Sequence, residues 1–80
     1  MTDDAEHPTR AEHLEWCKQR AREYLDHGEL ANAVASMLSD LTKHPETASS
    51  GRNPHLGMIG IIAARDNDAA AVRRFIEGFR

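Results

Sequence analysis

The sequence predicts an all-α domain of about four helices, arranged as two antiparallel helical hairpins. Apolar residues recur at three- and four-residue spacing in successive segments, which is the period of an amphipathic helix. Residues that start and stop helices separate these segments, with Gly28 in one turn and Pro45 after the second segment. The chain has 80 residues, which is enough for one small domain.

The first helix is expected over about residues 10–27. Thr9 and Glu12 have the spacing of a capping box, in which each side chain bonds the backbone amide of the other residue. Gly28 supplies the left-handed backbone position that ends the helix. The residues expected on its buried side are Leu14, Cys17, Ala21 and Leu25, with Tyr24 beside them.

The second helix is expected over about residues 29–43. Pro45 ends it, because proline cannot continue the hydrogen-bond ladder and disfavours helical geometry at the preceding residue. A connection of one or two residues requires the first two helices to pack antiparallel. The expected apolar face is Leu30, Ala33, Val34, Met37, Leu38 and Leu41. The residues expected to face away from the core are Ser36, Ser39, Asp40 and Lys43.

Residues 46–53 are expected to form a loop, because Ser, Thr, Gly and Asn dominate the segment. A third helix is expected over about residues 54–65, with Asn53 as its N-cap and proline in its first turn. Gly57 and Gly60 lie three residues apart in this helix, which suggests a close contact with another helix.

The alternative for Met58–Ile62 is a strand, since isoleucine favours strands. A single short strand would lack a partner, which favours the helix. A fourth helix is expected over about residues 68–78, in which Arg73 and Glu77 have the spacing of an ion pair on one helix face. Its expected apolar edge is Val72, Phe75, Ile76 and Phe79.

Residues 1–8 are acidic and polar, and we expect them to form a disordered tail before a single helical domain over residues 9–80. The net charge of −3 disfavours broad attraction to nucleic acid or to an anionic membrane. The longest apolar run, Leu56–Ala64, is about half the length of a membrane span, and the start of the chain does not resemble a signal peptide. We therefore expect a cytoplasmic protein without membrane association.

The Tyr24–Pro45 hairpin resembles a single tetratricopeptide repeat, a helix-turn-helix unit with a period of about 34 residues. The first signature position holds Cys17 where that repeat has tryptophan, and Trp16 is one residue away. Because the second half of the chain does not repeat the pattern, the resemblance implies a way of packing two helices and no peptide-binding groove. The matching residues are Ala21, Tyr24, Gly28, Leu30, Ala33, Met37 and Pro45.

Residues 12–47, 56–58 and 73–80 together resemble a group of small uncharacterised proteins encoded by actinobacterial phages and prophages. The resemblance covers most of the chain. It implies a phage setting and the cytoplasm of a bacterial host, and it implies no activity.

The sequence carries no recognisable catalytic, cofactor or complete metal motif. His13 and Cys17 are four residues apart, so a helix would place two types of metal ligand on one face, but a site needs two more ligands. The simpler interpretation is a surface histidine beside a half-buried cysteine, and the same cysteine lacks the third residue of a thiol nucleophile. Asp66 and Asp68 lack the glycine and glutamate of a calcium loop. The further histidines that could complete a metal site are His27, His44 and His55.

We therefore predict that the protein is not an enzyme, needs no cofactor and binds another protein, from the host or the phage. Trp16 has three possible roles: it caps the core, it packs in a homodimer seam, or it is exposed as an anchor for another protein. Phe79, near the C-terminus, is either docked on the core or offered to a partner. The candidate contact residues are Trp16, Tyr24, Arg20 and Phe79.

Two alternatives remain at this point. One is a small regulator that binds nucleic acid through Arg73 and Arg74 together with bases of the first helix, although acidic residues interleave with these bases. The other is a structural phage subunit that forms a homo-oligomer. The bases of the first helix are Lys18, Arg20 and Arg22.

Overall fold

The computed structural model describes residues 9–80, and every regular element in this range is a helix. The all-α prediction is therefore confirmed. The acidic tail predicted for residues 1–8 lies outside the described residues. The helices are α2 (Arg10–Asp26), α3 (Leu30–Leu41), α4 (Ala48–Arg52), α5 (Pro54–Arg65) and α6 (Ala69–Glu77).

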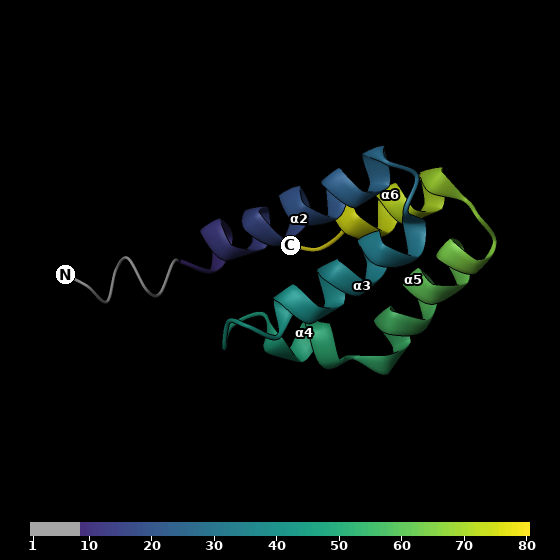
Figure 1. Cartoon of the computed structure of the whole chain (residues 1–80). Helices are drawn as coiled ribbons and strands as arrows, with labels where there is room; N and C mark the ends of the chain where they lie inside the picture. The colour runs from purple at the N-terminus through teal and green to yellow at the C-terminus, as the bar shows by residue number, and fades with distance from the viewer. Residues whose placement is uncertain (1–8) are drawn as a thin grey trace.

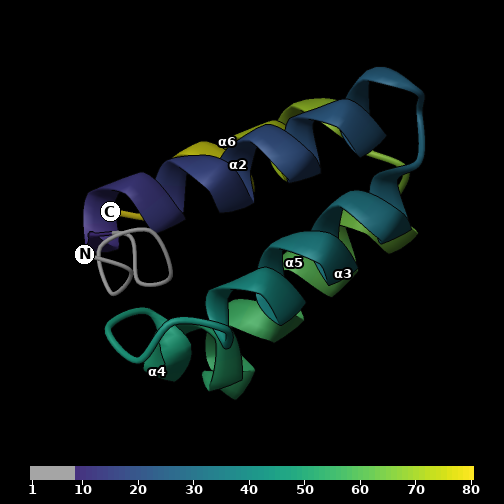
Figure 2. The same ribbon diagram turned by 60° about the vertical axis from the view of Figure 1, so that its left-hand side comes forward.

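The four longer helices form two layers (Figures 1 and 2). The α2–α3 hairpin is one layer, and α5 and α6 form the other, with α6 packed against α2 and α5 packed against α3. The core lies between the layers, where burial of apolar side chains stabilises the fold. Its largest fully buried apolar side chains are Met37, Leu41, Ile76 and Val72.

Local capping signals begin and end helix α2 as the sequence predicts. The Glu12 amide donates to Thr9 Oγ1 at 3.1 Å and the Thr9 amide donates to Glu12 Oε1 at 2.9 Å, which completes the capping box. Gly28 has a φ of 76°. The amides of Gly28 and Glu29 bond the carbonyls of Leu25 and Tyr24, both at 2.9 Å, as in a Schellman motif.

The segment predicted as a loop contains the short helix α4, so that prediction was wrong for Ala48–Arg52. The buried Thr47 hydroxyl donates to the Leu41 carbonyl at 2.6 Å, which ties the segment to the end of α3. Gly51 then approaches α3 so closely that a Cβ there would lie 2.7 Å from the Leu38 carbonyl oxygen. Residue composition indicates a turn here, but these contacts depend on the tertiary fold.

Ion pairs join the layers at their solvent edge. The expected pairing of Arg73 with Glu77 is replaced by contacts between α2 and α6: Arg22 Nε donates to Glu77 at 2.7 Å, and Arg73 lies 3.8 Å from Asp26. The Arg22 bonds lower the pKa of Glu77. Because the partners come from different helices, the spacing along one helix cannot predict them.

Asn53 is the N-cap of α5, as the sequence predicts. Its Oδ1 accepts from the amides of His55 and Leu56 at 2.9 and 3.4 Å. Replacing Asn53 with alanine should lower the free energy of unfolding by about 1 kcal/mol, because these amides lose their side-chain acceptor. Urea unfolding checks this, with Asn32→Ala on the exposed side of α3 as the control. An equal loss in the two variants would contradict a capping role.

Candidate functional site

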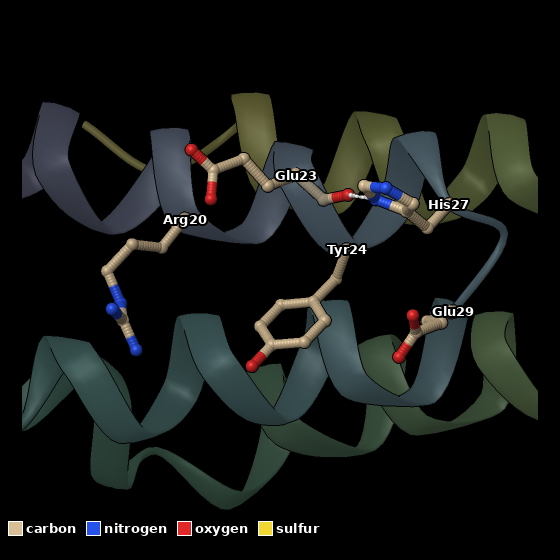
Figure 3. A pocket seen from close by; sticks show the side chains of 5 residues that line it. All are labelled: Arg20, Glu23, Tyr24, His27 and Glu29. Atoms are coloured by element: carbon tan, nitrogen blue, oxygen red, sulfur yellow. Dashed lines mark hydrogen bonds between the residues drawn. The ribbon is translucent and has the colours of Figure 1, made fainter.

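Three of the predicted contact residues share one exposed stripe of α2. Trp16, Arg20 and Tyr24 are spaced four residues apart, and 43% of Trp16 and 36% of Tyr24 remains exposed. Figure 3 shows Arg20 and Tyr24 reaching from α2 across the face of α3. Together with Lys43, these residues form what we call the α2–α3 surface. Trp16 therefore does not cap the core, which leaves the dimer seam and the partner anchor as its possible roles.

Two cations lie against the indole ring of Trp16. The guanidinium carbon of Arg20 is 4.9 Å from the ring centroid, and Nζ of Lys43 is 5.7 Å from it. Both distances allow attraction between the positive charge and the negative face of the ring. The indole is thus held in place while almost half of it stays open to a partner.

Asp40 holds these two cations in position. It was predicted to face away from the core, which is wrong, because its side chain is only 2% exposed. Its carboxylate accepts from Arg20 Nε at 2.7 Å and lies 3.0 Å from Lys43 Nζ. Burial alone would raise the pKa of Asp40, but the hydrogen bonds from Lys43 and Arg20 outweigh it and lower that pKa below its ordinary value.

His13 lies beneath this surface and not on it, which corrects the prediction of a surface histidine. It is 6% exposed, and its Nε2–H donates to the Asp40 carbonyl at 2.7 Å. Its ring centroid is 5.3 Å from that of Trp16 and 5.1 Å from that of His44. The indole therefore rests on a packed histidine, which adds to the order of the exposed stripe.

Cys17 is fully buried in the core, one helical turn beyond His13. Burial, and next the negative charge of Asp40, raises the pKa of Cys17 to about 11. The thiol therefore stays protonated at neutral pH, whereas nucleophilic attack and metal binding require the thiolate. Within residues 9–80, His, Cys, Asp and Glu side chains nowhere form a group of three able to hold a metal ion.

A shallow hollow of about 320 Å³ adjoins Tyr24 between α2 and the start of α3 (Figure 3). Glu23 and Glu29 line it together with Arg20. The α2–α3 surface is therefore basic at its Lys43 end and acidic beside the hollow, so a partner must match both charges in the correct direction.

Phe79 is not part of this surface. It is half-buried at the end of α6, where its ring meets Phe75 edge-on with the centroids 5.1 Å apart. Of the two roles considered for this residue, the structure supports docking on the core.

The bases considered for nucleic-acid binding are interleaved with acids. Arg22 bonds both Glu15 and Glu77, and Lys18 Nζ donates to the Glu77 carbonyl at 3.3 Å. Arg73 lies near Asp26, and Arg74 lines a hollow together with Leu56 and Phe79. Arg20, Arg22 and Arg73 thus each lie beside an acidic side chain, so the positive charge around them is locally compensated, unlike the continuous basic patch of nucleic-acid-binding domains.

The sequence interpretation missed a second exposed surface, on α5. Met58 is 59% exposed, Ile59 49%, Ile61 58% and Ile62 43%, and these four residues form what we call the α5 face. A signal was available, since residues 54–64 contain no Asp, Glu, Lys or Arg. A helix that is apolar on all sides needs a cover on all sides.

Comparisons of the chain with protein-family models, with curated proteins and with solved structures found no match. No helix within residues 9–80 combines the length and the apolar character needed to cross a bilayer.

Proposed function

We propose that this chain is a non-enzymatic protein-interaction module that binds its partner through the α2–α3 surface. The observation that carries the proposal is the half-exposed Trp16, with Arg20 and Lys43 against its ring. Tryptophan, tyrosine and arginine are the residues most enriched among those that dominate binding energy at protein interfaces. All three occur here on one stripe of one helix.

The arrangement lowers the cost of binding, because the long side chains are already ordered. Asp40 fixes Arg20 and Lys43 on either side of its carboxylate, and His13 supports Trp16 from below. Immobilising a flexible side chain at an interface costs about 0.5–1.5 kcal/mol, and here much of that cost is met during folding.

The surface fits a partner segment that combines a carboxylate with an apolar or aromatic side chain. A guanidinium has five N–H donors, and Asp40 takes the one on Nε of Arg20. The remaining donors suit a carboxylate in the paired geometry that arginine favours. The exposed part of Trp16 then receives the apolar side chain.

The setting we propose is the cytoplasm of a phage-infected bacterium. It follows from the resemblance of residues 12–47, 56–58 and 73–80 to actinobacterial phage and prophage proteins. The partner is then a host or phage protein, and binding acts by covering part of it with a rigid helical surface.

A photoreactive residue at position 24, in the exposed stripe, tests the proposal in the bacterial host. The covalently captured protein is then purified and titrated against the chain, using the emission of Trp16, the only tryptophan. Arg20→Glu should weaken binding on the order of 30-fold, about 2 kcal/mol. The ion pair that we propose between Arg20 and a carboxylate of the partner would become a repulsion between two carboxylates. Gln19→Ala, exposed on the same helix beside the stripe, is the matched control.

Trp16→Ala should weaken the same complex by a similar factor when binding is followed by calorimetry. The proposal fails if the captured protein binds Arg20→Glu and Trp16→Ala as tightly as it binds Gln19→Ala. It also fails if position 24 captures nothing that a photoreactive residue at Ala70, on α6, does not.

A further inference from the structure

Helix α5 places its large apolar side chains on the outside and its small residues on the inside. The residues of α5 that are buried are Gly60 and Ala63. Met58, Ile61 and Ile62 are each at least 43% exposed. The packing of α5 within the chain therefore removes little apolar surface from water. The largest apolar side chains of the helix are the ones that stay most exposed.

The α5 face is large for a chain of this size. Side chains of this kind at these exposures present roughly 100 Å² each, so the four total about 400 Å², a size typical of interaction surfaces. An apolar groove of about 420 Å³ extends it toward α3, lined by Ala35, Leu38, Ile61 and Ala64 among others. On the other flank, Leu56 and Ile59 line a hollow with Phe79.

We propose that a second copy of this chain covers the α5 face, with the two α5 helices packed against each other around a two-fold axis. In such a contact the same patch meets itself, so any charge near its centre would meet a like charge. Residues 54–64 contain no Asp, Glu, Lys or Arg, and the face is therefore compatible with itself. The contact is independent of the α2–α3 surface, which lies on the other layer of the molecule (Figure 2).

The charges at the ends of α5 favour the antiparallel orientation. Arg52 precedes the helix, whereas Arg65, Asp66 and Asp68 at its other end sum to a net charge of −1. An antiparallel pair places Arg52 of each copy at the acidic end of the other, and it also places the positive end of each helix dipole beside the negative end of the other. A parallel pair would bring the aspartates of the two copies together.

The area and the small core point to a second copy as the partner. The smallest specific interfaces bury about 600 Å² of surface on each partner. The exposed area of the four side chains approaches this value when the flanking groove is included. An 80-residue chain buries a limited fraction of its surface, and self-association is a common way to complete such a core. A second copy is also present wherever the chain itself is made.

Sedimentation velocity of the full chain over a wide concentration range tests the proposal. The expected species has twice the chain mass of 8.9 kDa, and its mass should not change between low and high salt, because the centre of the contact is apolar. Ile62→Glu should raise the dissociation constant of the dimer at least about 100-fold. Both copies carry the substitution, so two negative charges would lie in the apolar contact. Ala70→Glu adds the same charge at an exposed position of α6 and should leave the dimer intact.

Circular dichroism shows whether Ile62→Glu still folds, and a photoreactive methionine analogue at position 58 of the otherwise unchanged chain gives an independent answer. It should join two copies, with the adduct near Ile62 of the other copy if the helices are antiparallel. A single-chain mass at all concentrations, or dimers that Ile62→Glu leaves unchanged, would overturn the proposal. Capture of a different protein at position 58 would also overturn it, while leaving the proposed role of the α2–α3 surface intact.

Discussion

Replacing Gly60 with alanine should destabilise the protein by about 1–3 kcal/mol, although alanine is the better helix former by about 1 kcal/mol. A Cβ at this position would lie 2.8 Å from Cζ of Phe75 and 2.9 Å from Cγ1 of Val34. Both neighbours are buried, so neither can move without disturbing the contact between the layers. Gly60→Leu should cost more than Gly60→Ala, because the added atoms enter the same closed space. Thermal and urea unfolding measure both losses.

Gly57 provides the matched control in the same helix. A Cβ there would meet only Leu38 Cδ1, at the ordinary contact distance of 3.8 Å. Gly57→Ala should therefore stabilise the protein by up to about 1 kcal/mol, through helix propensity alone. If the two glycine substitutions change stability in the same direction and by the same amount, α5 does not pack against α3 and α6 at Gly60 as the structure shows.

The parts of the fold that depend on neighbouring residues in the sequence could be predicted. The capping box at Thr9, the left-handed turn at Gly28 and the N-cap Asn53 each need only a few consecutive residues. The close approach at Gly60 was also suggested, because small residues at helical spacing favour helix contacts. These local signals are strong enough to place the four longer helices.

The parts that depend on other helices could not be predicted. Asp40 was assigned to solvent by its charge and its place on α3, but Arg20 of α2 compensates that charge. The same holds for His13, whose hydrogen-bond partner is 27 residues away. Helix α4 forms because Thr47 and Gly51 dock on α3, in a segment whose composition favours turns.

The candidate site was predicted only in part, for the same reason. The sequence singled out Trp16, Arg20 and Tyr24 as candidate contacts without fixing whether Trp16 is exposed, and the structure places all three on one exposed stripe. The sequence alone could not identify Lys43 as part of the site, because Lys43 approaches Trp16 only where α3 packs antiparallel to α2. The α5 face was missed because an apolar run is ordinarily interpreted as core.

Replacing Asp40 with alanine should lower the free energy of unfolding by about 2–3 kcal/mol at neutral pH, because it removes a buried carboxylate that accepts charge-assisted hydrogen bonds from two cations. It also frees Arg20 and Lys43 to leave Trp16, whose emission should then be quenched more readily by iodide. The matched control is Asp26→Ala, since Asp26 is 69% exposed in its 3.8 Å pair with Arg73 and should change stability by no more than about 0.5 kcal/mol. Equal losses in the two variants would contradict the assigned role of Asp40.

The contribution of Asp40 should also depend on pH in a definite direction. Its pKa in the folded protein lies below the ordinary value of 3.8, so the unfolded chain takes up the proton first as the pH falls. The stabilisation is therefore complete above that ordinary value and is lost as the pH falls through the lower pKa of the folded state.

The difference in unfolding free energy between the native chain and Asp40→Asn isolates this effect. The shift at Glu77 has the same sign, but it is present in both chains and cancels in the difference. We expect the difference to be constant from pH 7 to about pH 5 and to shrink below about pH 4. A difference that stays constant to pH 2, or that grows as the pH falls, would show that Arg20 and Lys43 do not hold the carboxylate of Asp40 in its charged form.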